Sequence, residues 1–190
     1  MRTFIAIALP PEVKETLGKL QDELKTAQAD VKWVEPENIH LTLKFLGEID
    51  EEQLQELSVI LDGIGQKTKS FTLELAGIGA FPKIQFPRVI WVGATKGNEE
   101  AAKIAQVIED ESSKVGIPKE DRAFSSHITL GRVRSPLHLA QLTQRLMQLL
   151  QGEQIKCAPF TVRSVTLFKS ALSPAEPRYE RLKEVSLINI

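Results

Sequence analysis

Two short phrases of the chain carry residues able to do acid–base chemistry. Residues 40–43 read His-Leu-Thr-Leu and residues 127–130 read His-Ile-Thr-Leu, so two of the three histidines stand in near-copies of one pattern. Successive side chains of a β-strand point to opposite faces, which places each histidine and the threonine two positions later on one face. The pattern indicates a site with two imidazoles and two hydroxyls held on rigid strands.

Phosphoryl transfer is the chemistry that suits these four side chains. Histidine titrates near neutrality, so His40 and His127 can serve as one base and one acid in the same turnover. Thr42 and Thr129 can donate hydrogen bonds to anionic oxygens. A phosphate activated by ring strain, such as a 2′,3′-cyclic phosphate, needs no metal ion. The sequence contains no His-x-His, His-x₃-His or paired-cysteine arrangement, so we expect neither a metal nor another cofactor.

Strands and amphipathic helices surround both phrases. The periodicity of apolar residues predicts four helices, and the second begins after an N-cap at Asp50 with Gln53 as its capping-box partner. Ser135–Pro136 open the last helix, which leaves His138 just inside it as a surface residue. The predicted strands are Arg2–Leu9, Val31–Val34, His40–Leu46, Phe71–Ile78, Val89–Val92, His127–Val133, Phe160–Phe168 and a segment around Tyr179–Leu187.

Both halves of the chain repeat one order of elements: strand, helix, motif strand, helix, strand. Phe4 in the first strand precedes His40 by 36 residues, and Ile90 in the matching strand precedes His127 by 37. We therefore predict an α+β fold of two pseudo-symmetric lobes. Each lobe is expected to be an antiparallel sheet with helices on its outer face, and the His-x-Thr strands are expected to face a central cleft.

The halves are expected to form one structural unit. No low-complexity segment or flexible linker separates them, and 190 residues suffice for a substantial core. Residues 1–190 are therefore predicted to be a single bilobal domain. Its motif-bearing halves lie at about 1–80 and 88–170, and the C-terminal strand returns to the fold.

Charge and composition narrow the function classes. The net charge of −1 argues against a protein that coats long nucleic acid. Residues 1–110 carry 12 Lys and Arg against 18 Asp and Glu, whereas residues 111–190 carry 12 against 7, so the second part can present a positive field to a phosphate. No segment approaches the apolar length of a membrane span, and Met1–Leu9 reads as a buried strand, so we expect no membrane association. The single Cys157 favours a reducing, cytoplasmic setting.

The longer phrases around the two histidines resemble a known pair of signatures. Trp33–Gly47 and Phe124–Arg132 resemble the two motifs of the two-histidine phosphoesterases. The first phrase is similar, more narrowly, to the RNA 2′,3′-cyclic phosphodiesterases, also called 2′-5′ RNA ligases. Arg2–Ile7 and Arg178–Glu180 add to the resemblance, which spans nearly the whole chain.

The resemblance implies an activity and a partner. It implies hydrolysis of a 2′,3′-cyclic phosphate at an RNA end to a 2′-phosphate, together with a reversible, ATP-independent joining of tRNA halves through a 2′-5′ bond. By resemblance, His40 protonates the departing 3′ oxygen, His127 activates water, and Thr42 and Thr129 bind phosphate oxygens. No protein partner is implied. The residues alone do not order the two histidines, because a pseudo-symmetric site offers both roles.

Arg132 is a further candidate for binding the phosphate. The family's second motif commonly ends in Arg, and a guanidinium near the phosphate would stabilise transition-state charge. Strict alternation, however, places Arg132 on the face of Ile128 and Leu130, away from His127. A bulge at Gly131 would re-aim the side chain. A structural salt bridge is the alternative role.

Five more side chains are candidate substrate contacts. Lys44 shares strand parity with His40 and can line the cleft, or it can be an exposed lysine at a strand end. Phe45 and Tyr179, along with Phe81 and Phe168, are candidate platforms for a base. Phe45 has the parity of a core residue, which is the commoner place for an aromatic on a strand.

Two other functions remain compatible with the sequence. One is a nucleotide- or RNA-end-binding module that kept the cleft without turnover, and the other is a cyclic phosphodiesterase acting on a small nucleotide. Two complete His-x-Thr pairs favour an enzyme, because a binder needs only the cationic and hydroxyl contacts.

Overall fold

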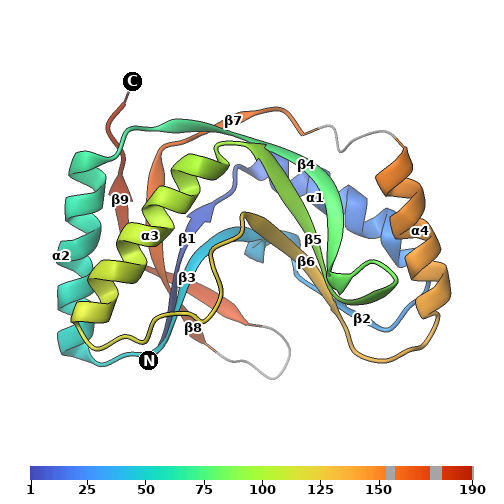
Figure 1. Cartoon of the computed structure of the whole chain (residues 1–190), viewed down its shortest axis with the longest axis horizontal. Coiled ribbons are helices and arrows are strands. Elements are labelled where there is room, and N and C mark those ends of the chain that lie inside the picture. Colours follow the sequence, from blue (N-terminus) through green and yellow to red (C-terminus); the bar gives the residue numbers. More distant parts are fainter. Residues whose placement is uncertain (153–156, 172–176, 190) are drawn as a thin grey trace.

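The computed structural model describes residues 1–152, 157–171 and 177–189. The strands and α-helices follow one another in the predicted order, except that the predicted strand over residues 160–168 is two strands (Figure 1). The elements are β1 (Arg2–Ala8), α1 (Pro11–Lys25), β2 (Val31–Trp33), the 3₁₀ helix η1 (Pro36–Asn38), β3 (His40–Glu48), α2 (Glu51–Lys67), β4 (Phe71–Lys83), β5 (Phe86–Lys96), α3 (Asn98–Lys114), β6 (His127–Val133), α4 (Leu139–Gln151), β7 (Phe160–Val162), β8 (Ser164–Ala171) and β9 (Arg178–Ser186).

The described strands form two antiparallel sheets, in the orders β3-β1-β8-β9 and β2-β6-β5-β4-β7. Helices α2 and α3 pack against the first sheet, whereas α1 and α4 lie with the second (Figure 1). The predicted α+β class is therefore confirmed. Of the motif strands, β3 is an edge strand of its sheet and β6 lies one strand in from the edge, next to β2.

Each half of the chain contributes elements to both sheets. The chain leaves β1 in the first sheet to form α1 beside the second, and it leaves β5 in the second sheet to form α3 beside the first. The last strands, β8 and β9, complete the first sheet, and β2 joins the edge of the second. The two exchanges mirror one another, which is the pattern of a pseudo-two-fold axis.

Apolar faces of the motif strands and their neighbours meet in one buried cluster. Ile5 and Leu41 enter it from the first sheet, and Ile90 and Leu130 from the second. Each aliphatic side chain fully removed from water contributes about 1.5–3 kcal/mol to folding. The strands that carry the histidines are thus anchored from behind by the core.

Helix boundaries agree with the sequence at α2 and differ at α4. A carboxylate oxygen of Asp50 accepts the backbone N–H of Gln53, and the Gln53 side chain accepts the backbone N–H of Asp50, as predicted. The last helix begins at Leu139 and not at Ser135–Pro136. His138 has φ 52°, a left-handed conformation that a right-handed helix cannot contain, so the helix starts only after it. In the described ranges, no helix has the length and apolarity needed to cross a membrane.

Candidate active site

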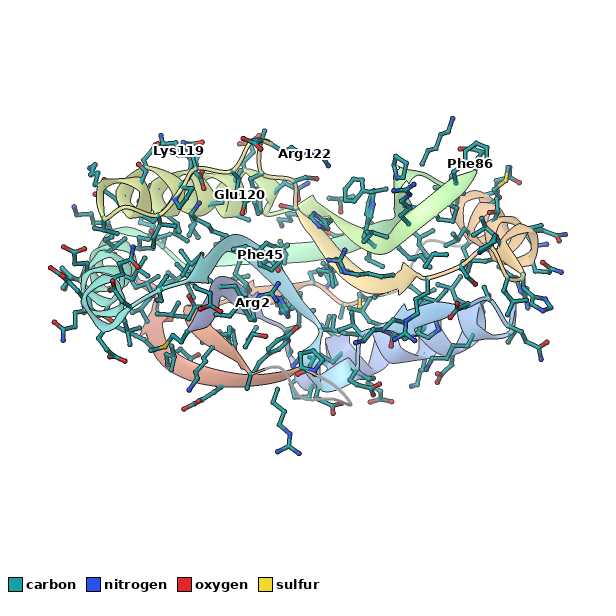
Figure 2. All side chains as sticks on the ribbon, turned by 90° about the horizontal axis from the view of Figure 1, so that it is seen from below. Arg2, Phe45, Phe86, Lys119, Glu120 and Arg122 are labelled. Atoms are coloured by element: carbon teal, nitrogen blue, oxygen red, sulfur yellow. The ribbon has the colours of Figure 1, made fainter. Side chains whose placement is uncertain are left out.

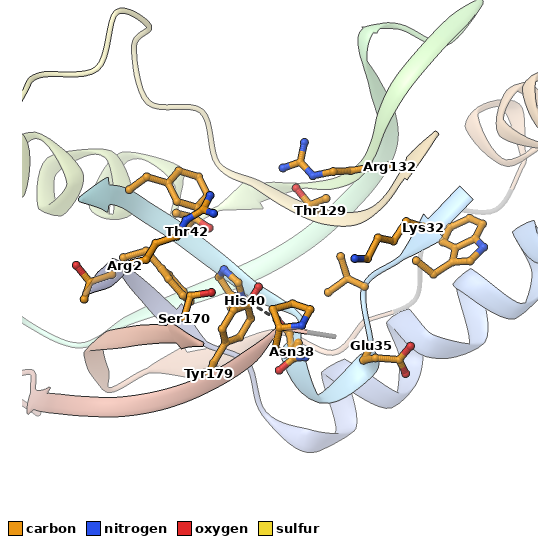
Figure 3. Close-up of a pocket in the computed structure, with 16 residues that line it drawn as sticks. Arg2, Lys32, Glu35, Asn38, His40, Thr42, Thr129, Arg132, Ser170 and Tyr179 are labelled. Atoms are coloured by element: carbon orange, nitrogen blue, oxygen red, sulfur yellow. Dashed lines mark hydrogen bonds between the residues drawn. The ribbon is translucent and has the colours of Figure 1, made fainter. Parts of the chain in front are cut away.

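A cavity of about 370 Å³ lies between the two motif strands (Figure 3). Six residues predicted from the sequence line it: His40, Thr42 and Phe45 from β3, Thr129 and Arg132 from β6, and Tyr179 from β9. His127 is not among the lining residues, although it begins the same strand face two positions before Thr129. The structure therefore brings both threonines and one histidine to one cavity, and it places the second histidine on the strand face of Thr129.

The two histidines make the same hydrogen bond. Nδ1 of His40 donates to the backbone carbonyl of Asn38 at 2.7 Å, and Nδ1 of His127 donates to that of Ser125 at 2.8 Å. A carbonyl oxygen can only accept, so Nδ1 carries the hydrogen in both rings. Nε2 is consequently the ring atom left for proton transfer in each case.

Aromatic rings enclose His40. Phe4 stacks on it at 4.8 Å, and Tyr179 meets it edge-on at 5.4 Å. Burial by these neighbours lowers the pKa of His40 below its ordinary value, and the nearby ammonium of Lys14 acts in the same direction. The hydrogen bond to Asn38 opposes this shift without cancelling it. The free protein therefore favours neutral His40, and an anion in the cavity would favour its protonated form.

Cations line the wall of the cavity. Arg132 lies opposite His40, while Arg2 and Lys32 line other parts of the wall (Figure 3). Burial raises the pKa of Tyr179, and the guanidinium charges of Arg132 and Arg2 oppose that rise, so both charges act on this side of the cavity. Tyr179 itself lines the cavity, which is where a substrate contact predicted from the sequence would have to lie.

Arg2 and Lys32 were not selected from the sequence as site residues. Arg2 belongs to an N-terminal phrase that otherwise reads as a buried strand, which hid its side chain among apolar neighbours. Lys32 stands between Val31 and Trp33 in the three-residue strand β2. Its pairing with Arg132 across the β2–β6 ladder puts it at the site, and only the tertiary structure supplies that pairing.

A bulge in β6 gives Arg132 its place in the cavity. Trp91 of β5 pairs with Thr129, and the preceding Ile90 pairs with Gly131, so the ladder skips Leu130. Leu130 and Gly131 are both buried, and the next side chain, Arg132, turns to the face of Thr129. Strict alternation was therefore the wrong guide to Arg132, and a bulge at this point re-aims it.

A second bulge, at the equivalent position of β3, overturns two assignments made from alternation. Ala6 of β1 pairs with Thr42 and Ile5 pairs with Lys44, so the ladder skips Leu43. Lys44, predicted to line the cleft or to be exposed at a strand end, is instead only 1% exposed and lies on the covered face. Phe45, predicted to have core parity, is 57% exposed and lines the cavity. The extra residue inverts the parity of Lys44 and Phe45, and a second register shift follows at Leu46.

Metal ligands and the one cysteine are the other groups that could do chemistry. Within residues 1–152, 157–171 and 177–189, no three His, Cys, Asp or Glu side chains are grouped so as to hold a metal ion. Cys157 is buried, and its burial raises the pKa of the thiol, which disfavours the nucleophilic thiolate. The residues best suited to acid–base work are therefore those of the His-Thr faces.

Known sequences match the chain over nearly its full length. The family described as LigT like Phosphoesterase matches it twice, over residues 7–91 and 92–179. An RNA 2′,3′-cyclic phosphodiesterase of Methanocaldococcus jannaschii is 38% identical over 184 residues, which cover 97% of this chain and 99% of the relative. A protein of the same name from Methanothermobacter thermautotrophicus is 31% identical over 179 residues, covering 94% and 95%.

Solved structures share the fold. The crystal structure of the Thermus thermophilus protein TT0787 matches with a TM-score of 0.81 and 29% identity, covering 100% of this chain and 99% of the other. The structure of E. coli LigT complexed with 3′-AMP matches with a TM-score of 0.79 and 27% identity, covering 98% and 97%. Sequence and fold agree along the whole length, and the chain belongs to the LigT-like, two-histidine phosphoesterase family.

Proposed function

We propose that this protein is an RNA 2′,3′-cyclic phosphodiesterase that converts a cyclic phosphate end to a 2′-phosphate without a metal ion. The matched pair of histidines, each with Nδ1 bonded to a backbone carbonyl and Nε2 left for proton transfer, is the observation that carries the proposal. The cavity beside them supplies hydroxyl and guanidinium donors, which suit an anionic phosphate. The names of the curated relatives support the same substrate.

The proposed reaction uses one histidine as base and the other as acid. Nε2 of His127 accepts a proton from water as its oxygen bonds to phosphorus. The bond between phosphorus and the 3′ oxygen breaks, and Nε2–H of His40 protonates that oxygen. Thr42, Thr129 and Arg132 donate to the phosphate oxygens as charge develops. The negative substrate favours the protonated form of His40 that burial disfavours in the free protein.

Neighbouring residues would hold the rest of the RNA end. Tyr179 lies beside His40 and suits contact with the terminal nucleotide. Phe4 stacks on His40 and its ring centroid is 6.2 Å from that of Phe45, so exposed Phe45 lies one ring farther along the cleft. A base stacked on such a ring gains about 1–3 kcal/mol. Phe45 therefore suits a base beyond the reacting phosphate, whereas Lys44, buried behind the strand, is no longer a candidate contact.

The same site would join RNA ends. A ribose 5′-hydroxyl in place of water would give up its proton to His127, bond to phosphorus and displace the 3′ oxygen, leaving a 2′-5′ linkage. No nucleotide cofactor enters this exchange, since the strained ring supplies the activation. The halves of a cleaved tRNA are the RNA ends proposed for this joining.

The working unit proposed for this chemistry is the whole chain, residues 1–190, as one bilobal domain. Support comes from the site itself, which draws β3 from the first half and β6 from the second. The compartment proposed is the cytoplasm, where a protein with a single cysteine, Cys157, has no disulfide to lose.

An oligoribonucleotide ending in a 2′,3′-cyclic phosphate tests the proposal directly. The protein should open the ring in the presence of EDTA, and phosphorus NMR of the product should find the phosphate on the 2′ oxygen alone. A requirement for a divalent ion would overturn metal independence. Binding without turnover would indicate a binding module, and turnover confined to a mononucleotide would indicate a small-nucleotide enzyme.

A further inference from the structure

A buried glutamine holds the bulge that aims Arg132. Gln21 of α1 is 0% exposed, and its Nε2 donates to the backbone carbonyl of Leu130 at 2.9 Å and to that of Val34 at 2.6 Å. Leu130 is the residue that the β5–β6 ladder skips. Gln21 is therefore a second donor to a backbone carbonyl at the bulge itself, two residues before Arg132, since the same carbonyl also accepts the backbone N–H of Val34 at 2.9 Å.

A buried ion pair holds the equivalent bulge in β3. Nζ of Lys44 lies 2.5 Å from a carboxylate oxygen of Glu109 on α3, and it donates to the backbone carbonyl of Pro118 at 3.0 Å. The other oxygen of Glu109 accepts the backbone N–H of Glu120 at 2.5 Å. The side chain of Glu120 in turn accepts the backbone N–H of Phe45 at 3.2 Å. These contacts close a ring around the bulge, and Figure 2 shows Glu120 beside Phe45, on the segment that also carries Lys119 and Arg122.

The two arrangements occupy equivalent places in the pseudo-symmetric fold. Gln21 precedes His40 by 19 residues, and Glu109 precedes His127 by 18. Helices α1 and α3 both cross from the sheet of the preceding strand to the opposite sheet. Each crossing helix thus brings one polar side chain to the bulge of the motif strand in the other lobe: the fully buried Gln21 from α1, and the partly exposed Glu109 from α3.

A bulge needs such support because the strand could otherwise pair with its neighbour in a regular ladder that has no extra residue. Without the extra residue, every following side chain moves to the opposite face of the strand. Arg132 and Phe45 would then leave the cleft and point toward the helices. A polar group buried at the bulge stabilises the bulged form, because its hydrogen bonds have no partner in the regular one.

We propose that Gln21 and the Lys44–Glu109 pair are positioning residues, which fix the two bulges and thereby turn Arg132 and Phe45 into the cleft. The functional consequence rests on the cyclic phosphodiesterase activity proposed above. Gln21 acts on the chemical step through Arg132. Lys44 and Glu109 act on RNA binding through Phe45.

A double-mutant cycle tests the first arm. Gln21→Met keeps the length of the side chain and removes its donor, and it should lower kcat for a cyclic-phosphate oligonucleotide by about a hundredfold, the cost of a small misplacement near reacting atoms. In an Arg132→Ala background the same change should cost almost nothing further. Full, additive losses in the double variant would overturn the proposal, because they would mean that Gln21 does not act through Arg132.

A split between KM and kcat tests the second arm. Lys44→Met should raise KM for an oligonucleotide about tenfold, as loss of a stacking platform predicts, and leave kcat nearly unchanged. Lys44→Arg, which keeps the charge and a donor for Glu109, should restore most of the affinity. Equal losses in kcat for both variants would overturn this arm.

Two further variants serve as controls for effects of these substitutions on folding. Replacing a buried ion pair by apolar side chains is often neutral for stability, so Lys44→Met/Glu109→Leu keeps the test open if Lys44→Met does not fold. Ser112→Ala is the control on the same helix, because Ser112 of α3 is buried and its hydroxyl donates to the carbonyl of Glu109 within its own helix. It should alter stability without changing KM.

Amide hydrogen exchange separates this inference from the proposed activity. Gln21→Met should increase exchange at residues 130–133, and Lys44→Met at residues 43–46, whether or not the wild-type protein turns over the oligonucleotide. Unchanged exchange in both variants would overturn the support of the bulges. Local exchange without wild-type turnover would leave the bulge support standing and reject the cyclic phosphodiesterase activity alone.

Discussion

The outer edges of the two motif strands are covered in different ways. Along β6 runs β2, and the two form a regular antiparallel ladder in which Lys32 pairs with Arg132. Along β3 runs the segment of residues 118–120, at the same distance before the second histidine as β2 stands before the first. Side chains hold this segment: Lys44 binds its Pro118 carbonyl, and Glu120 binds the strand. The strand edge beside the β6 bulge is thus covered by a backbone ladder, to which Gln21 adds its hydrogen bonds, and that beside the β3 bulge by an ion-pair network.

The two motif strands present different groups to the cleft. The bulge in β6 presents a guanidinium, which suits the phosphate, and that in β3 presents an aromatic ring, which suits a base. Gly131 stands where β3 has Lys44, and a Cβ there would lie 2.7 Å from Val31, so the ladder with β2 excludes a side chain at this point. Where the covering segment is not a strand, Lys44 fills the space and provides the attachment.

The largest effects should come from the histidines, and they should reveal asymmetry through pH. His40→Ala and His127→Ala should each lower kcat/KM by about 10³-fold or more, since a pair of coupled proton transfers depends on both. The wild-type profile should be bell-shaped. His127→Ala should abolish the acidic limb, because the base must be deprotonated, and His40→Ala the basic limb, because the acid must be protonated.

Initial rates across the range from mildly acidic to mildly alkaline pH measure these limbs. Loss of the same limb in both variants would contradict the assignment of distinct roles. A variant that keeps near-normal turnover would remove its histidine from the mechanism.

Removing the guanidinium of Arg132 should slow the chemical step more than removing the ring of Phe45. Arg132→Ala should lower kcat by about 10²–10³-fold, as losing one donor to developing charge commonly does. Single-turnover kinetics with a cyclic-phosphate oligonucleotide measure the chemical step. Arg132→Lys is the control for charge alone, and full activity in it would show that the fork of donors is not used.

Removal of the ring should affect binding. Phe45→Ala should raise KM for an oligonucleotide by about tenfold, within the range of one lost base–aromatic stack. Phe45→Trp should restore the affinity because it restores a platform. The effect should be larger for the oligonucleotide than for a nucleoside 2′,3′-cyclic phosphate. Equal effects on both substrates would place Phe45 at the terminal nucleotide instead.

The smallest effect is a pH dependence of stability from the enclosed His40. Burial lowers its folded-state pKa below the value of 6.5, so the unfolded chain binds a proton that the folded chain does not in the interval between the two values. The free energy of unfolding should therefore decrease as pH falls through this interval, which lies below pH 6.5. Urea denaturation of wild type and His40→Gln measures it. An unchanged slope in the variant would assign the dependence to other groups.

The sequence was a good guide up to the third residue after each histidine and a poor one beyond. Alternation correctly put His40 with Thr42 and His127 with Thr129, because a regular pleat depends on nearest neighbours alone. Arg132 and Phe45 do not follow the alternation, since the bulges depend on Gln21 and Glu109, which lie far away along the chain. Lys44 looked like a cleft residue for the same reason.

Element order was predictable as well, because apolar periodicity and capping are local. The exchange of helices between the lobes was not, since α1 and α3 carry the same kind of amphipathic pattern that any covering helix has. Lys32 joined the site only through that exchange. The predicted pseudo-symmetry could indicate two lobes, but it could not indicate which segments of one half of the chain join the sheet of the other lobe.

The place of β8 in the first sheet governs when this protein can become active. Thr3–Ala6 of β1 pair with Thr166–Lys169, so more than 150 residues must be synthesised before that ladder can close. Contacts so distant along the chain slow folding and delay it toward the end of translation. Phe168 of β8 and Tyr179 of β9, whose ring centroids lie 6.5 Å and 5.4 Å from that of His40, are synthesised late on the ribosome. A nascent chain would therefore carry the His40 motif long before it had an active site.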